Sequence, residues 1–354
     1  MRQLPAATVS HRRRFGLLGQ ALEVETNDPR VLDLAGTAFG RFPVPDGVEP
    51  LALTVIVERS RGVPAEPAGI DPGDRRNGHH GASEGDLRAA DSHRFDDVVY
   101  RTHGATVLLA GRDRDVATMD PTTGRATAYV GESAFRDPRG LRFAFLEALA
   151  YWMLAYPRGY LAMHATGIGR GSVGVIVEGP AGAGKSTVAV AAARRGLSVF
   201  AEDAVFARLA GDGLELWGTP WVQRLLPDAA KLFPELATLP IVRQPNGEDK
   251  LEVDLVRWFP GTAVPSARPG AFVSLVRDPG APTELLPAAA PDDSPEFLWP
   301  YDLDWPPAQH AVAEAIEALP AYRLCVGGGP DEAVDALEEL LDRLVVAAGR
   351  ASVG

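Results

Sequence analysis

Residues 174–187, Gly-Val-Ile-Val-Glu-Gly-Pro-Ala-Gly-Ala-Gly-Lys-Ser-Thr, contain a complete phosphate-binding loop (P-loop), which reads G-x-x-x-x-G-K-S from Gly179 to Ser186. The β-branched residues at 175–177 predict a buried strand before the loop, and the alanine-rich stretch 188–195 predicts a helix after it. A glycine-rich turn that merely precedes a lysine would lack this context. The stretch therefore predicts an α/β domain that binds a nucleotide.

The residue types in this loop suit a phosphate chain. Gly182 and Gly184 lack the Cβ atoms that would obstruct the approach of backbone N–H groups, and the helix N-terminus adds partial positive charge. Lys185 is expected to reach the terminal phosphates, and the Ser186 hydroxyl to hold Mg²⁺. The predicted nucleotide-binding residues are Gly179, Pro180, Ala181, Gly182, Ala183, Gly184, Lys185, Ser186 and Thr187.

A pair of carboxylates follows the next predicted strand, at Glu202 and Asp203. A strand–helix–strand unit is right-handed and makes its strands parallel, so this pair and the P-loop are expected at the same edge of the sheet. One carboxylate can complete the Mg²⁺ shell and the other can accept a proton from an attacking hydroxyl. Asp203 follows Lys185 by only 18 positions (203 − 185), a shorter spacing than in many P-loop NTPases. A solvated acidic turn is the alternative.

A histidine lies on the strand predicted before the P-loop strand. Residues 160–168 are expected to form this strand, with a tight turn at 169–172. An antiparallel hairpin about this turn places His164 opposite Val177, one step from the P-loop. A slip of one residue would change the face that His164 uses, so a histidine packed on a strand stays open as the alternative.

The order of these parts resembles the catalytic core of HPr kinase/phosphorylase and its HPr-kinase-like relatives. The resemblance is carried by Met163-His164-Ala165, the P-loop, and the stretch from Arg195 to Asp203, and it covers roughly residues 140–260. It implies a P-loop kinase domain of the type shared with phosphoenolpyruvate carboxykinases. It also implies ATP- and Mg²⁺-dependent transfer of the γ-phosphoryl group to a hydroxyl, usually that of a serine.

The resemblance also implies roles for individual residues. Glu202 stands where the family's first Asp acts as the base, Asp203 stands at the second Asp, and His164 assists the base. Together with the P-loop reasoning, this predicts Glu202, His164 and Lys185 as catalytic residues and Ser186 and Asp203 as metal ligands. This chain departs from the family in having a glutamate at position 202, whose side chain is one methylene longer than that of the family's Asp. No stretch after residue 205 matches the bacterial enzyme's own C-terminal signature, so the closer match is to divergent relatives, some of which modify peptides or small molecules.

Several alternatives remain open at this point. The acceptor could be a peptide, a protein or a small molecule, and a P-loop ATPase or nucleotide-dependent switch would need only a positioned water. Arg224 and Lys250 are candidates to stabilise transition-state charge, with solvated surface cations as the alternative interpretation. Self-association into a homo-oligomer is also open.

The rest of the chain predicts a second, smaller domain. We expect a flexible arm at 1–14, a small α+β domain at 15–135 and the P-loop kinase domain at 136–354. Residues 60–94 are polar and rich in Gly and Pro, which predicts a disordered loop. Short strands between 95 and 130 predict an antiparallel meander. A helix opening at Asp137-Pro138 presents an apolar stripe, formed by Leu141, Phe145, Leu149, Trp152 and Tyr156.

Composition limits the partners. The net charge of −12 argues against non-specific binding to nucleic acid or to a membrane surface. The most apolar long stretch, 141–156, contains Arg142 and Glu147 and is too short to span a bilayer. The lone Cys325 excludes an internal disulfide and fits a reducing, cytoplasmic location.

Overall fold

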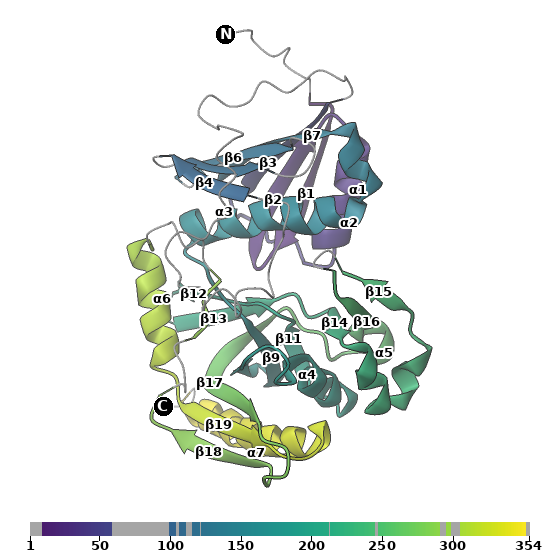
Figure 1. Ribbon diagram of the computed structural model, residues 1–354. Coiled ribbons are helices and arrows are strands. Elements are labelled where there is room, and N and C mark those ends of the chain that lie inside the picture. Colours follow the sequence, from purple (N-terminus) through teal and green to yellow (C-terminus); the bar gives the residue numbers. More distant parts are fainter. Residues whose placement is uncertain are drawn as a thin grey trace. The chain divides into compact units, whose positions relative to one another are not determined.

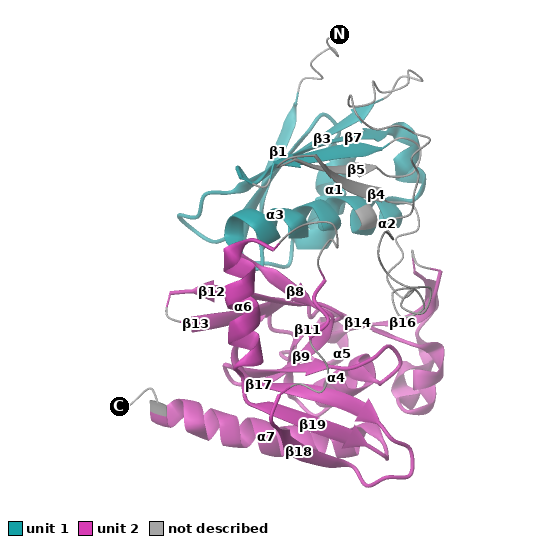
Figure 2. Ribbon diagram, turned by 60° about the vertical axis from the view of Figure 1, so that its left-hand side comes forward, with its two compact units in different colours: residues 1–158 teal, residues 159–354 magenta. Residues whose placement is uncertain are grey.

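The computed structural model describes residues 9–58, 99–103, 106–110, 115–120, 122–211, 213–244, 247–290, 295–298 and 305–351. The chain divides into two compact units, Met1–Arg158 and Gly159–Gly354, which Figure 2 shows in separate colours. The loop predicted at 60–94 lies outside the described residues, as do residues 1–8. Within the described parts, no helix is long and apolar enough to cross a membrane.

Unit 1 contains a seven-stranded mixed sheet in the order β1-β2-β3-β7-β6-β5-β4. Its elements are β1 (His11–Leu17), β2 (Gln20–Thr26), α1 (Pro29–Phe39), β3 (Leu51–Glu58), β4 (Val99–His103), β5 (Thr106–Ala110), β6 (Val116–Asp120) and β7 (Arg125–Gly131). Strands β4 to β7 pair antiparallel in sequence order, which confirms the predicted meander. The predicted arm ends earlier than expected, because β1 already begins at His11 and pairs along its whole length with β2.

A helical stretch closes unit 1: η4 (Glu132–Arg136), α2 (Pro138–Gly140), the π-helical η5 (Leu141–Glu147) and α3 (Ala148–Arg158). Asp137 caps it by accepting a hydrogen bond from the Gly140 N–H. α3 buries Leu149, Ala150, Met153 and Leu154, so Leu149 of the predicted stripe is buried, whereas Trp152 and Tyr156 are half-buried. Because η5 and α3 contact α1 and β7, residues 136–158 belong with unit 1 and not with the predicted domain 136–354.

Unit 2 carries a nine-stranded mixed sheet with the path β11-β9-β10-β17-β13-β12-β8, to which β19 and β18 add beside β17, and a three-stranded sheet β14-β16-β15 (Figure 1). Its elements are β8 (Leu161–Met163), β9 (Ala165–Arg170), β10 (Val173–Glu178), α4 (Lys185–Arg194), β11 (Ser198–Ala201), β12 (Val205–Ala210), β13 (Gly213–Gly218), β14 (Val222–Leu225), η6 (Pro227–Lys231), η7 (Pro234–Thr238), β15 (Ile241–Arg243), β16 (Asp249–Asp254), α5 (Leu255–Trp258), β17 (Ser266–Arg277), β18 (Glu284–Ala288), α6 (Pro307–Glu317), β19 (Ala321–Val326) and α7 (Pro330–Ala351).

The strands around the P-loop differ from the predicted hairpin in register. β9 pairs antiparallel with both β10 and β11, so β10 and β11 run in the same direction, as predicted, but with β9 between them. Thr166 lies opposite Val177, so the prediction that His164 faces Val177 is wrong by two residues. The reason is that the two-residue turn uses Gly171, with φ +60°, and Ser172, one position later than expected.

The predicted strand 160–168 is also interrupted at His164. Residues before it form β8, which pairs with β12, whereas residues after it form β9, which pairs with β10. His164 therefore stands where the chain passes from one part of the sheet to another.

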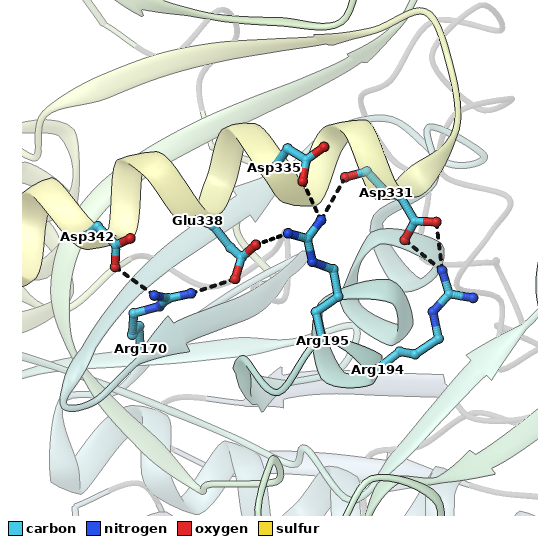
Figure 3. A network of polar contacts seen from close by, with 7 residues as sticks. All are labelled: Arg170, Arg194, Arg195, Asp331, Asp335, Glu338 and Asp342. Atoms are coloured by element: carbon cyan, nitrogen blue, oxygen red, sulfur yellow. Dashed lines mark hydrogen bonds and ion pairs between the residues drawn. The ribbon is translucent and has the colours of Figure 1, made fainter.

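The face of the sheet beside the P-loop is covered by α4 and α7. Alanines on α4 are buried and allow the helix to lie close to the strands, while Val334, Leu337 and Leu341 of α7 complete this core. Figure 3 shows that an ion-pair network joins α7 to the neighbouring elements. Arg170 of β9 contacts Glu338 and Asp342 at 2.6 and 2.8 Å, Arg194 contacts Asp331 at 2.6 Å, and Arg195 contacts Asp335 and Glu338.

One close approach in this sheet predicts a stability effect. A Cβ added to Gly167 of β9 would lie 2.3 Å from the buried ring of Phe200. Gly167→Ala should therefore lower the free energy of unfolding by about 1–3 kcal/mol, measured by urea denaturation. Gly213→Ala is the control, because a Cβ there meets nothing within 4 Å. Equal stability of the two variants would contradict the packing.

Candidate active site

The P-loop connects β10 to α4 in a conformation that glycine permits. Gly182 and Gly184 have φ of +82° and +103°, and a Cβ at either position would meet nothing within 4 Å. Gly184 is the N-cap of α4 and provides no side-chain cap for the helix. The first N–H groups of α4 therefore have no capping side chain at their N-terminus, an arrangement that suits a bound phosphate.

Lys185 lies folded into this loop. Its side chain is buried, and Nζ donates a hydrogen bond to the Gly179 carbonyl oxygen at 2.5 Å. Burial lowers the pKa of Lys185, and the negative charges of Asp203, Glu178 and Glu296 oppose that shift in part. The Lys185 ammonium group is thus held beside the loop backbone, where it could pair with the negative charge of a phosphate chain. The carboxylates near it could bind a metal ion that accompanies the phosphates.

His164 lies between two carboxylates. Its Nε2 is 3.1 Å from Asp203 Oδ1, and its Nδ1 is 2.8 Å from Glu296 Oε2. The ring is buried, which lowers its pKa, but the hydrogen bonds to Asp203 and Glu296 outweigh burial and raise the pKa to about 9. At neutral pH the imidazole is therefore protonated, and both ring N–H groups donate.

Asp203 reaches His164 from the end of β11. Its backbone has φ +44°, in the left-handed region that Asp tolerates better than most residues. The preceding strand end is tied to β9, because the Thr166 hydroxyl donates to the Ala201 carbonyl oxygen at 2.7 Å. The Asp203 side chain is 58% exposed, so its carboxylate can contact both His164 and a ligand.

Glu202 forms a separate contact. Its side chain is buried, and Oε2 accepts a hydrogen bond from Arg224 Nη1 of β14 at 2.7 Å. Burial raises the pKa of Glu202 to about 7, with Arg224 opposing the shift and Asp203 adding to it. A carboxyl group whose pKa lies near neutrality is suited to accept and release protons. Arg224 also forms an ion pair with Glu252 of β16, in which Nε lies 3.6 Å from Glu252 Oε1.

The structure thus brings together three of the residues singled out in the sequence, Lys185, His164 and Asp203. Ser186 and Thr187 lie half-buried in the first turn of α4. Glu202 is next to Asp203 in the chain but pairs with Arg224. Lys250 pairs instead with Glu248, at 3.1 Å.

Sequence reasoning missed Glu296. Residues 295–298 extend the sheet beyond β8: Phe297 forms an antiparallel bridge with Met163, and the Leu298 N–H donates to the Ala162 carbonyl at 2.8 Å. The segment carries no strand-like periodicity in the sequence. Its position follows only from this pairing with β8.

No protein-family model matches the sequence, and no curated protein matches it. Among solved structures, the chain is similar to one described as the Hpr(Ser) kinase/phosphatase from Coxiella burnetii, with a TM-score of 0.29 and 15% sequence identity. That match covers 55% of this chain and 99% of the other.

Proposed function

We propose that this chain is an ATP- and Mg²⁺-dependent phosphotransferase that moves the γ-phosphoryl group to a hydroxyl, serine-type acceptor on a peptide, protein or small molecule. The observation that carries the proposal is the position of Lys185 and the His164–Asp203 pair around one P-loop within unit 2. The P-loop alone would suit any nucleotide-binding protein. The charged side chains beside the loop favour chemistry on the terminal phosphate, and Glu202, next to Asp203 in the chain with a pKa raised to about 7, is the candidate base.

The residues fit the nucleotide and the metal. Residues 179–187 would hold the phosphates through backbone N–H groups, and Lys185 would meet the terminal ones. Ser186 and Asp203 would hold Mg²⁺. The described residues contain no group of three or more His, Cys, Asp or Glu side chains that could hold a metal. Mg²⁺ usually binds through one or two protein ligands plus substrate phosphates, and Ser186, Asp203 and the phosphates of ATP would provide such a set.

The acid–base step is assigned to Glu202. ATP, when bound, supplies the phosphoryl group; the oxygen of the acceptor hydroxyl forms the new P–O bond, its proton passes to the Glu202 carboxylate, and ADP leaves with the electrons of the broken bond. Lys185 offsets negative charge on the phosphates. His164, which contacts Asp203 Oδ1 through Nε2, orients the Asp203 carboxylate toward the metal.

The test of the function uses γ-labelled ATP with Mg²⁺ and a pool of serine-containing peptides. The expected result is label in the peptides, at a rate above that of free phosphate release. Free phosphate as the sole labelled product would instead favour a P-loop ATPase or a nucleotide-dependent switch. Absence of any turnover together with absence of ATP binding would overturn the P-loop interpretation.

The metal assignment predicts a changed Mg²⁺ requirement. Ser186→Ala and Asp203→Asn should each raise the Mg²⁺ concentration needed for the half-maximal rate by about 10-fold or more, because each removes an oxygen ligand. Mg²⁺ titrations of the initial rate measure the effect. Ser172→Ala and Asp278→Asn, at exposed positions, are the matched controls. Unchanged Mg²⁺ dependence in both site variants would show that these residues do not hold the metal.

A further inference from the structure

Glu296 makes two contacts with the same histidine. Its backbone carbonyl oxygen accepts a hydrogen bond from the His164 N–H at 2.9 Å, and its side-chain Oε2 lies 2.8 Å from His164 Nδ1. The other ring nitrogen, Nε2, contacts Asp203 Oδ1 at 3.1 Å. The ring orientation is therefore defined from both sides, by carboxylates that come from different parts of unit 2.

The segment that carries Glu296 is itself anchored. Besides its pairing with β8, Phe297 packs edge-on against Trp305, with ring centroids 5.1 Å apart. Trp305 in turn packs against His310 of α6, at 5.5 Å. Backbone pairing on one side and aromatic packing on the other restrict the positions available to Glu296.

From this geometry we propose that Glu296 is a positioning residue for the phosphotransfer reaction, which holds His164 Nδ1 so that Nε2 faces Asp203. The arrangement is that of a carboxylate that orients a histidine whose other nitrogen serves a catalytic group. The expected effect of Glu296 on the reaction rate rests on the proposed function. The contact between Glu296 and His164 is independent of that function and can be tested without measuring turnover.

The first experiment observes the contact in the full chain. With ¹⁵N-labelled histidine, the His164 side-chain resonance is assigned by its loss in His164→Gln. Glu296→Gln should shift the Nδ1 resonance, because an amide replaces the charged acceptor, whereas Glu284→Gln, at an exposed position on β18, should leave it unchanged. A His164 resonance that is identical in wild type and Glu296→Gln would overturn the proposal.

The second experiment measures the consequence, with Mg²⁺·ATP and the serine-peptide pool as substrates. Glu296→Gln should lower kcat by about 10- to 100-fold while the KM for ATP changes little. In a His164→Gln background the same substitution should cause no further loss, because Glu296 acts through that ring. Losses that multiply in the double variant would overturn the positioning role.

The two experiments separate the two claims. A wild-type protein that transfers no phosphoryl group would refute the proposed function, and the resonance of His164 would still decide whether Glu296 orients it. Normal transfer with an unaffected Glu296→Gln variant would refute the positioning role alone. Urea denaturation of each variant shows whether a loss reflects unfolding instead.

Discussion

Lys185→Ala should reduce phosphoryl transfer by ~10²–10³-fold, the loss typical when a preorganised charge-stabilising group is removed from an active site. Lys185 is buried beside the Gly179 carbonyl, at the start of α4, so its ammonium group is already held next to the loop before a nucleotide binds. Alanine keeps the helix and removes the cation. ATP affinity, measured by fluorescence titration, should fall together with the rate.

Lys231→Ala is the matched control for this variant, since Lys231 is an exposed lysine on η6 within the same unit. It should leave both ATP affinity and rate unchanged. Lys185→Ala also removes a buried charge from a group of carboxylates, so its urea denaturation curve should accompany the kinetics. Wild-type ATP affinity and turnover in a folded Lys185→Ala protein would show that the loop does not bind the phosphates.

Glu202→Gln should abolish most of the phosphoryl transfer, by ~10²–10⁴-fold, and leave the affinity for ATP·Mg²⁺ intact. Glutamine keeps the shape of the side chain and its contact with Arg224, but it cannot accept the proton of the acceptor hydroxyl. His164→Ala should cause a smaller loss, because His164 supports the carboxylates and accepts no proton itself.

The pH dependence gives a second readout for Glu202. Burial raises its pKa to about 7, and a general base acts only when it is deprotonated. The rate should therefore rise with pH through about 7 in the wild type, and this limb should be absent in Glu202→Gln.

Glu252→Gln is the matched control for Glu202→Gln, because Glu252 is the other carboxylate beside Arg224. It perturbs the same guanidinium group without removing the proposed base, so its rate and its pH profile should stay close to those of the wild type. If Glu202→Gln retains the full rate and the same pH limb, Glu202 is not the base, and the neighbouring Asp203 has to be considered in its place.

The sequence by itself determined the local features of the site. The strand before the P-loop, the glycines within it and the helix after it lie within 22 consecutive residues, Val173–Arg194, and each follows from a pattern that needs no distant partner. The direction of β11, the strand that precedes Glu202 and Asp203, followed almost as directly. A strand–helix–strand unit has one hand, so the direction of β11 relative to β10 was predictable even though β9 separates them.

Tertiary structure decided the partners of the site residues. The turn at Gly171 lies one position later than the sequence predicted, so β9 pairs with β10 in a different register. The predicted strand 160–168 is divided at His164 into β8 and β9, which pair with different strands. Glu296 lies 132 residues from His164 in sequence, and Arg224 lies 22 residues from Glu202. Such pairings depend on which strand edges and side chains meet after folding, and their energies are spread over many long-range contacts. No local pattern encodes them, which is why the P-loop motif could be predicted from the sequence whereas the partners of His164 and Glu202 could not.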